Sequence, residues 1–253
     1  MKSIWILGTR VDDVTFEEAL DAIDGFIATR AARAVVTPNP EIVMAARSDP
    51  EYARVLNACG LAIPDGIGLL LAARLLGTRL RQHVRGTDLV HQLAARSAVR
   101  GDRWFLLGAA EGVAEQAGAA LRRDYPGLLV VGTYAGDARS SGDAANRAAI
   151  RAASPVDVIL VAYGGGAQER WMDRNLAELG IGVGLGIGGV LNFLAGRSPR
   201  APHWMRRLEL EWLHRLLTEP WRWRRQLALP RFVVLVLWTA VASLWGRTRS
   251  ARR

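Results

Sequence analysis

Short apolar runs that alternate with helix-like stretches are the feature that most limits the fold of this chain. Runs at residues 34–36, 61–63, 104–107, 128–131, 158–162 and 181–185 have the length and composition of buried strands. Each is separated from the next by a stretch with helical periodicity. This order is typical of βαβ units, so residues 1–196 are predicted to form an α/β domain with a Rossmann-like parallel sheet and helices on both faces.

Two helix starts in this domain carry a signature with a physical mechanism. Thr15 and Glu18 have the spacing of a capping box, in which each side chain satisfies a free backbone N–H of the other's residue. Asn39 and Pro40 follow the run at 34–36 and match an N-cap followed by an N1 proline. Helices are therefore expected from about residue 16 to 29 and from residue 40 onward.

The predicted strand ends gather polar and glycine residues on one edge of the sheet. In open parallel sheets, ligands bind beyond the carboxyl ends of the strands. The residues that directly follow the predicted strands include Thr37, Asn39, Asp65, Gly66, Gly108, Gly164, Gly165, Gly166, Gly188 and Gly189. We therefore expect the active site at this edge.

Asp65 is the candidate general base. It stands between Pro64 and Gly66 directly after an apolar strand, where a carboxylate can take the proton of a hydroxyl nucleophile. It could equally be the N-cap of the next helix. Thr37 and Asn39 have the same two interpretations: contact with a sugar or base, or capping of the helix that Pro40 opens.

Arg85 is a candidate phosphate ligand. It lies just before a helix that Thr87 or Asp88 is expected to cap, and a helix N-terminus already favours anions. A solvated surface arginine is the alternative. Gln168, after the glycines at 164–166, could donate its amide to a substrate. The pattern G-x-G-x-x-G at 184–189 is no Rossmann fingerprint, because Pro199 and Pro202 leave no room for the βαβ unit.

Metal and cofactor chemistry are not expected. The four histidines are scattered, no Asp-x-Asp sequence occurs, and the one cysteine, Cys59, is expected to be a small buried apolar group. No Ser-His or Cys-His arrangement suggests an enzyme nucleophile. If a diphosphate leaves in the reaction, arginines must therefore meet its charge.

The net charge of +9 is confined to the C-terminal part of the chain. Residues 1–196 hold 20 basic and 21 acidic side chains, whereas residues 197–253 hold 13 arginines, three glutamates and six of the nine tryptophans. The first residues resemble no signal peptide, so the protein is expected on the cytoplasmic side. A basic, tryptophan-rich segment there favours docking to an anionic membrane surface.

Two apolar segments give this C-terminal tail its predicted form. Residues 204–218 match one amphipathic helix that Pro220 ends, and residues 232–245 form an apolar run between arginines. A helix of 14 residues spans about 21 Å, less than the hydrocarbon core of about 30 Å, which favours a peripheral position over a transmembrane one. Packing against the body or a second subunit, as in a homo-oligomer, and nucleic-acid binding are the alternatives, and the apolar run argues against nucleic acid.

Taken together, these motifs resemble the WecG/TagA/CpsF family of bacterial glycosyltransferases. The resemblance covers most of the chain to about residue 232. It is carried by Thr37-Pro-Asn39-Pro, Pro64-Asp65-Gly66, Arg85-Gly-Thr-Asp88, Gly-Ala-Gln168-Glu-Arg-Trp171, Gly188-Gly189, Arg200-Ala-Pro202, Glu211-Trp212 and Arg215-Leu-Leu-Thr-Glu-Pro220.

The resemblance implies a metal-independent, inverting transfer of N-acetylmannosamine or a related sugar. The donor is a UDP-sugar and the acceptor a sugar on undecaprenyl diphosphate, at the cytoplasmic membrane face, in polysaccharide or teichoic-acid-type synthesis. Asp65 would be the base. The sugar and diphosphate pocket would be lined by Thr37, Asn39, Arg85 and Gln168, and completed from the tail by Arg215, Arg222 and Arg225.

The chain departs from the family pattern at three places. It has Gly188-Gly-Val-Leu191-Asn192 where the family often has Gly-Gly-x-Phe-Asp, Gly165-Gly166-Ala167 where Gly-x-Pro is usual, and Glu209 in place of a glycine. The first two border the implied nucleotide pocket, where Gly108, Gly188 and Asn192 are candidate substrate contacts.

Overall fold

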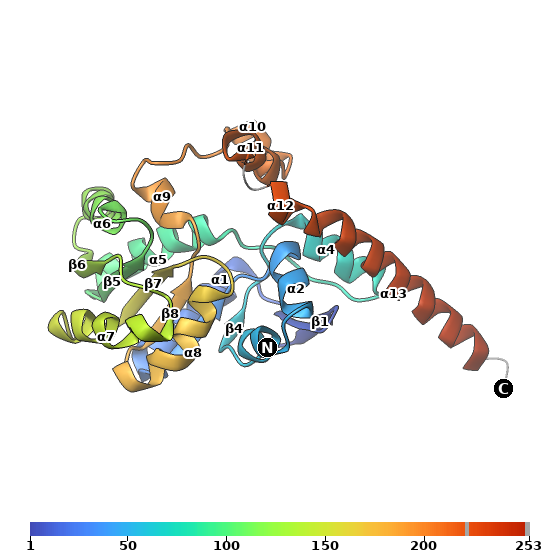
Figure 1. Cartoon of the computed structure of the whole chain (residues 1–253), viewed down its shortest axis with the longest axis horizontal. Coiled ribbons are helices and arrows are strands. Elements are labelled where there is room, and N and C mark those ends of the chain that lie inside the picture. The colour runs from blue at the N-terminus through green and yellow to red at the C-terminus, as the bar shows by residue number, and fades with distance from the viewer. Residues whose placement is uncertain (221–222, 251–253) are drawn as a thin grey trace.

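The computed structural model, which describes residues 1–220 and 223–250, has a six-stranded parallel sheet at its centre (Figure 1). The strands lie in the order β4-β3-β8-β7-β5-β6. Their bounds are β3 Arg33–Val36, β4 Leu61–Ala62, β5 Arg103–Gly108, β6 Leu129–Tyr134, β7 Val158–Ala162 and β8 Val183–Gly186. The predicted α/β fold is confirmed, with each expected strand present and its ends shifted by no more than three residues.

Helices cover both faces of the sheet because successive strand residues point to opposite sides. Val35 and Leu106 pack into one cluster, while Val36 and Phe105 pack into the other. The first face is covered by α1 Phe16–Thr29, α5 Gly86–Arg100 and α6 Val113–Asp124. The second is covered by α2 Pro40–Arg47, α3 Pro50–Asn57, α7 Asp143–Ala152 and α8 Ala167–Leu179, with a 3-10 turn at Ser140–Gly142 before α7.

The predicted helix starts are confirmed at two of three places. Thr15 and Glu18 form the capping box of α1, and Asn39 caps α2 with Pro40 behind it. The expected start of α5 was wrong: the helix begins at Gly86, and Arg85 stands at the N-cap position. Neither side chain expected to cap this helix does so: Thr87 is buried, and Asp88 pairs with Arg200.

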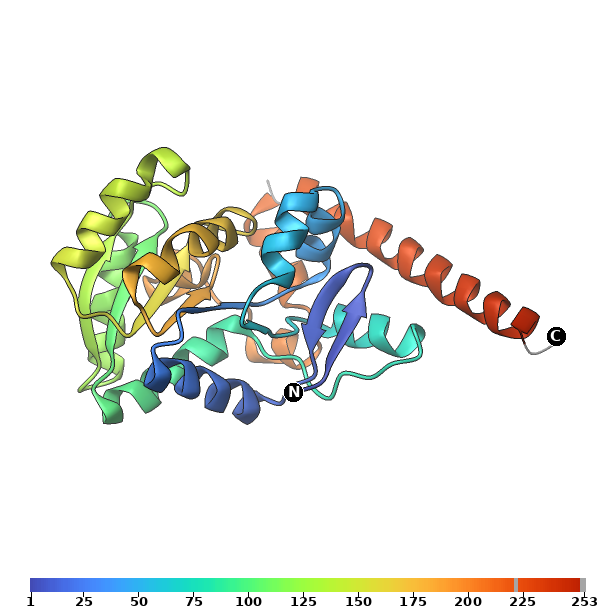
Figure 2. The same ribbon diagram turned by 90° about the horizontal axis from the view of Figure 1, so that it is seen from below.

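A small antiparallel hairpin, β1 Ser3–Ile6 and β2 Thr9–Asp12, was not predicted. Figure 2 shows its two dark-blue arrows apart from the main sheet. Its turn places Leu7 and Gly8 at φ 49° and 89°, which is the left-handed region that a two-residue hairpin turn needs. Leucine rarely adopts that conformation, and Leu7-Gly8 stands where such a turn usually has Asn-Gly. The sequence therefore showed no sign of a hairpin. The hairpin packs with α4 Ile67–Leu75 in a third apolar cluster.

The tail begins after α9 Val190–Leu194 and does not contain the single amphipathic helix expected over residues 204–218. It forms α10 His203–Arg207 and α11 Glu211–Thr218 instead. The chain turns between them at Glu209, whose φ of 60° cannot belong to a right-handed helix. Side-chain partners on the body hold Glu209 in place, a long-range cause that periodicity cannot reveal.

A long apolar helix, α13 Ala228–Ser250, follows the short α12 Trp223–Gln226 and projects from the body (Figure 1). Its 23 residues span about 34 Å. The length argument against a membrane span was therefore wrong, because Pro230 is accommodated in the first turn of the helix. Residues Trp223–Ser243 are long and apolar enough to cross a bilayer by length and composition.

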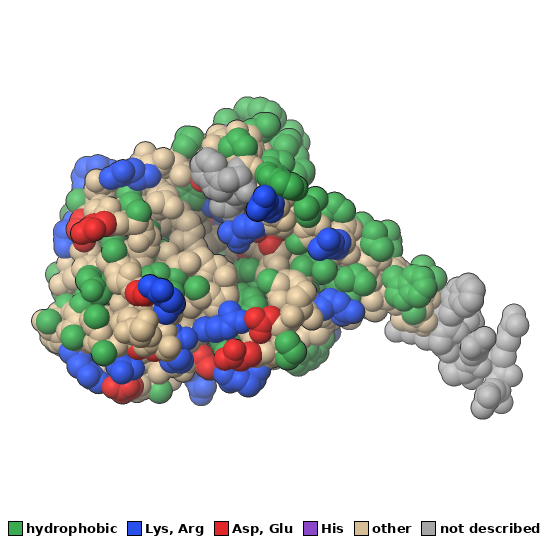
Figure 3. All heavy atoms as spheres, viewed as in Figure 1, with side chains coloured by type: hydrophobic (Ala, Val, Ile, Leu, Met, Phe, Trp, Pro, Cys, Tyr) green, Lys and Arg blue, Asp and Glu red, His purple; other side chains and the backbone are tan. Residues whose placement is uncertain are grey.

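Over residues 228–243, one side of α13 packs on the body and the other side is exposed. Phe232 and Val236 are buried in the cluster shared with α2, α4 and the hairpin. Val234 and Trp238 are 64% and 75% exposed. Figure 3 shows hydrophobic side chains gathered over α10, α11 and α13.

Candidate active site

Backbone hydrogen bonds bring three of the predicted motifs together at the carboxyl end of β3 and β4. The Asp65 amide donates to the Pro38 carbonyl at 2.8 Å, and the Val84 amide donates to the Pro64 carbonyl at 2.8 Å. The first bond ties the Thr37 loop to the Asp65 loop, and the second ties the segment before Arg85 to both. These motifs are far apart in the sequence, yet they form one continuous surface at this edge of the sheet.

Asp65 is free of the capping role that sequence allowed it. The N-cap of α4 is Gly66, and no side chain caps that helix end. The pKa of the Asp65 carboxyl is raised from its ordinary 3.8 to about 7, chiefly by burial. Glu211 and Glu209 contribute to the rise, while Arg215 and Arg85 oppose it. A carboxylate with a pKa near neutrality is suited to take up a proton during catalysis and release it afterwards.

Arg85 lies at the contact between the body and the tail. Its Nη2 donates to the Arg206 carbonyl at 2.7 Å and to the Glu209 carboxylate at 2.7 Å, and its Nε lies 3.7 Å from Glu211. The same Glu209 oxygen lies 3.1 Å from Nε2 of His83. Arg85 is therefore no solvated surface arginine: it holds the turn between α10 and α11 against the strand-end loops.

Two of the three tail arginines expected in the site do face the body. The Arg215 guanidinium lies 4.6 Å from the ring centroid of Phe193 on α9, and its charge lowers the pKa of Asp65. Arg225 on α12 lies 3.3 Å from Glu41 in the first turn of α2. Arg222 lies outside the described residues, so its predicted place in the site stays a prediction.

Thr37 and Asn39 lie at the end of β3, beside Asp65. The Asn39 side chain accepts the Ile42 amide at 3.0 Å and caps α2. The capping interpretation is thus confirmed for Asn39, which leaves its amide NH₂ as the group it could offer a ligand. Thr37 is half-buried between β3 and Pro38, and its contact with a substrate stays a prediction.

Gln168 is buried between the glycine loops that follow β7 and β8. Its Oε1 accepts the Gly188 amide at 2.9 Å, and its Nε2 donates to Glu169 at 2.9 Å. A Cβ on Gly186 would lie 2.8 Å from that Nε2, so only glycine allows the amide this close. Gln168 joins the two loops directly, and its predicted contact with substrate stays a prediction.

Gly108 lies at the part of the edge farther from Asp65, whereas Asn192 is next in sequence to Phe193, which contacts Arg215. Gly108 ends β5, four strand positions from β4, which places it about 19 Å along the sheet edge. Its φ is 103°, and a Cβ there would lie 2.8 Å from the Ala162 backbone, so the glycine is needed for strand packing. Asn192 lies on α9 above β8. Their expected roles in binding substrate stay predictions.

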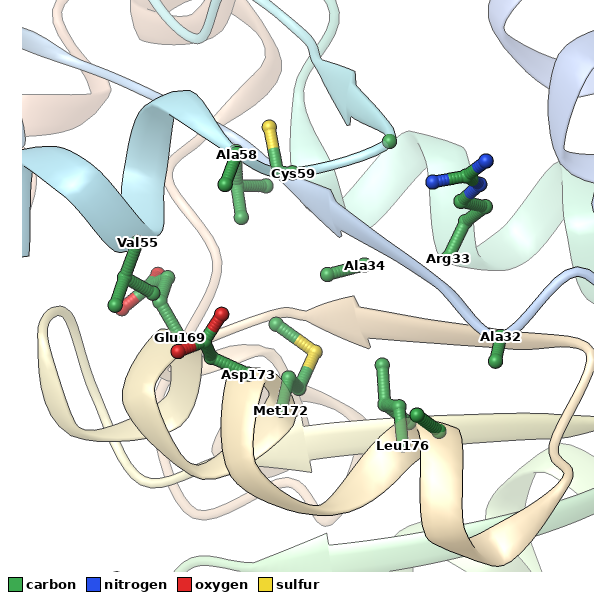
Figure 4. Close-up of a pocket in the computed structure, with 13 residues that line it drawn as sticks. Ala32, Arg33, Ala34, Val55, Ala58, Cys59, Glu169, Met172, Asp173 and Leu176 are labelled. Carbon is green, nitrogen blue, oxygen red and sulfur yellow. The ribbon is translucent and has the colours of Figure 1, made fainter.

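A cavity of about 120 Å³ lies away from Asp65, between α3, β3 and α8, and is lined by residues such as Val55, Cys59 and Met172 (Figure 4). Glu169, the partner of Gln168, also lines it, but none of the other residues discussed above does. Across residues 1–220 and 223–250, no three His, Cys, Asp or Glu side chains come together as metal ligands would.

The structure adds carboxylates to the site that sequence reasoning did not single out as site residues. Glu209 and Glu211 face Arg85, Glu41 faces Arg225, and Glu169 supports Gln168. Glu209 had a signal in its departure from the family's glycine, and Glu211 and Glu169 stand inside motifs that carry the family resemblance. Glu41 lies two residues after Asn39, and a charge near a motif is not distinctive by itself.

Comparison with known proteins agrees with this geometry. The model of the "Glycosyl transferase WecG/TagA/CpsF family" matches residues 4–245, and so includes the whole sheet and most of the tail. The chain belongs to this family. The resemblance stated from its motifs is thereby confirmed.

Curated relatives share one name. A protein of Bacillus spizizenii is 35% identical over 80% of this chain and 78% of its own length, and one of Bacillus subtilis is 33% identical over 84% and 82%. A Staphylococcus aureus protein is 30% identical over 90% and 89%. All three are N-acetylglucosaminyldiphosphoundecaprenol N-acetyl-beta-D-mannosaminyltransferases.

Proposed function

We propose that this glycosyltransferase moves N-acetylmannosamine from a UDP-linked donor to N-acetylglucosamine on undecaprenyl diphosphate, in teichoic-acid-type or related envelope synthesis. The observation that carries the proposal is Asp65: a carboxylate with a pKa of about 7 at the strand ends, with Arg85 and Arg215 beside it. The names of the curated relatives support the choice of donor sugar and acceptor.

The reaction is a single displacement. Asp65 takes the proton of the acceptor hydroxyl as its oxygen attacks the anomeric carbon of the donor. The bond from that carbon to the diphosphate oxygen breaks, so the sugar is inverted and UDP leaves with the bonding electrons. No covalent bond to the enzyme forms, which agrees with a site built around a base and cations.

Arginines take the charge that develops on the leaving diphosphate. Arg85, Arg215 and Arg225 come from two parts of the chain, and Glu209 and Glu41 hold two of them in the ligand-free protein. A diphosphate can replace or share these carboxylate partners, because it offers the guanidinium groups stronger, multidentate acceptors. We propose that this cationic charge makes a divalent metal unnecessary.

The tail also places the enzyme at the cytoplasmic face of the membrane, where a polyprenyl acceptor is found. Its exposed tryptophans and α13 supply an apolar surface, and its arginines supply attraction to anionic lipid. The acceptor diphosphate then lies just above the interface, within reach of the sheet edge.

The proposal is tested by UDP release with and without acceptor. Wild-type protein should release UDP only when the lipid-diphosphate N-acetylglucosamine acceptor is present, and EDTA should not change the rate. Asp65→Asn keeps the side-chain shape and should lower kcat by about 10³-fold. Asp173→Asn changes an exposed acid that pairs with Arg54 at 2.7 Å and should leave kcat unchanged.

Near-normal turnover by Asp65→Asn would remove Asp65 as the base. A wild-type protein that binds vesicles but releases no UDP with any donor would instead be a non-catalytic membrane-binding protein.

A further inference from the structure

Glu169 is a buried carboxylate with three hydrogen-bond donors around it. It is 2% exposed and extends from α8 toward α3 (Figure 4). Its Oε2 accepts the Gly166 amide at 2.6 Å and the Tyr52 hydroxyl at 3.3 Å, and its Oε1 accepts Nε2 of Gln168 at 2.9 Å. Burial raises the pKa of this carboxyl, whereas the hydrogen bonds from Gln168, Gly166 and Tyr52 lower it, so these donors favour the charged form.

Glu169 determines which way the Gln168 amide faces. With Nε2 at the carboxylate, Oε1 is left to accept the Gly188 amide at 2.9 Å. The flipped amide would set an oxygen against the carboxylate and an NH₂ against the Gly188 N–H, which loses both bonds and adds two repulsive contacts. The orientation of Gln168 therefore follows from the charge of its neighbour.

The two loops that this network joins follow adjacent parallel strands. Gly166 follows β7, Gly188 follows β8, and these strands pair directly in the sheet. Glu169 binds the first loop through the Gly166 amide and the second through Gln168. Arg170 binds the first loop as well, through the Gly166 carbonyl at 3.2 Å, but has no link to the second. Among the hydrogen bonds of residues 1–220 and 223–250, the Glu169–Gln168 pair is the one that couples these two loops.

We propose that Glu169 is a positioning residue for the donor nucleotide-sugar. By fixing the Gln168 amide, it holds the loops after β7 and β8 in the one arrangement that fits the donor, without touching the donor itself. This inference rests on the proposed function in naming a UDP-sugar as the ligand. The acceptor side of the site, at β3 and β4, lies outside the network and should not depend on it.

The direct test is Glu169→Gln, which keeps the shape but permits the amide of Gln168 to flip. We expect the KM for the UDP-sugar to rise about tenfold and the KM for the lipid acceptor to stay within about twofold. Glu178→Gln is the matched control, because Glu178 is an exposed glutamate on the same helix that pairs with Arg151 at 2.7 Å. It should change neither KM.

Two further measurements separate positioning from a general loss of structure. The NMR amide signal of Gly188 should move in Glu169→Gln, although Glu169 and Gly188 share no hydrogen bond. Gln168→Met removes the link and keeps the volume, so it should weaken UDP binding about as much as Glu169→Gln, and the double variant should lose no more. If Glu169→Gln fails to fold, Tyr52→Phe removes one donor to Glu169 and leaves Gln168 in place, and the Gly188 signal should then move with weaker UDP binding.

UDP affinity measured by calorimetry distinguishes the possible failures. Unchanged UDP affinity, with an unmoved Gly188 signal, would overturn the positioning role while leaving the proposed function intact. Additive losses in the double variant would also overturn it. If the wild-type protein transferred no sugar and the variants bound UDP more weakly than it does, the positioning role would be supported and the proposed function contradicted.

Discussion

Tryptophan shows how differently the two regions of this molecule use apolar groups. In the α/β body, Trp104 and Trp171 are fully buried in the two clusters that flank the sheet. In the tail, Trp204, Trp212 and Trp238 are 59%, 45% and 75% exposed. The body buries these side chains in its own core, whereas the tail exposes apolar surface of the kind that binds a membrane or another protein.

The arginines show a second contrast. Arg96 of the body pairs with the exposed Glu17 and Asp21, and surface ion pairs of this kind contribute little to stability. In the tail, Arg215 and Arg225 turn toward the strand ends. We propose that the tail has two functions, binding a membrane and supplying charge to the active site, and four measurements can separate or disprove them.

The largest effect is expected at the seam between the regions. Phe232 on α13 is 3% exposed and packs with the hairpin and α4, so Phe232→Ala should lower the free energy of unfolding by about 3 kcal/mol. Val233→Ala, at a 52% exposed position on the same helix, should change it by less than about 0.5 kcal/mol. Equal effects in denaturant titrations without lipid would mean that α13 is not packed on the body.

Arg215→Ala should lower kcat by about 100-fold, because it removes a cation from the leaving diphosphate. The measurement is sugar transfer to a short-chain acceptor in detergent, where membrane docking plays no part. Arg207→Ala removes an exposed arginine of the same tail and is the control. If both variants transferred sugar normally, the tail would serve the membrane only.

Trp238→Ala should weaken binding to anionic vesicles about tenfold, because the variant lacks the indole ring that would be buried in the apolar part of the membrane. Trp5→Ala is a matched control from the body, because Trp5 is 60% exposed on the hairpin and lies outside the tail. Sedimentation with vesicles measures both. A larger effect at Trp5 would move the docking surface to the hairpin.

The smallest effect is a shift in pH dependence. Burial raises the pKa of Asp65 to about 7, and only the ionised form can accept a proton, so kcat/KM should rise with pH and level off above about 7. Arg215 lowers that pKa, so in Arg215→Ala the rise should move to higher pH by about one unit. A rise centred near pH 4 would contradict the buried-base assignment.

The body could be predicted from sequence because its rules are local. Apolar runs of strand length, the capping box at Thr15 and the proline after Asn39 each specify their own segment, and parallel pairing then brings the strand ends together. This was sufficient to place Thr37, Asn39 and Asp65 at one edge, whereas Arg85 was assigned to the pocket only through the family resemblance. It could not show that Glu169 orients Gln168, because that contact depends on three-dimensional packing.

The tail was predicted less well because distant contacts decide its shape. Glu209 interrupts the expected helix by pairing with Arg85 and His83, more than 120 residues earlier in the chain. The apolar helix was expected to be too short because only the run between Arg231 and Arg247 was counted, whereas α13 continues through both arginines. Tail residues are arranged by the body, so their own pattern is insufficient.

The central claim is that body and tail form one sugar-transferring site, and product analysis tests it most directly. Wild-type protein is incubated with UDP-linked N-acetylhexosamines and a short-chain lipid-diphosphate N-acetylglucosamine, and the lipid is analysed by mass spectrometry. The account predicts one added N-acetylhexosamine, matched by one UDP released, with the N-acetylmannosamine donor preferred. An unmodified acceptor with every donor, or UDP release that does not require the acceptor, would contradict it.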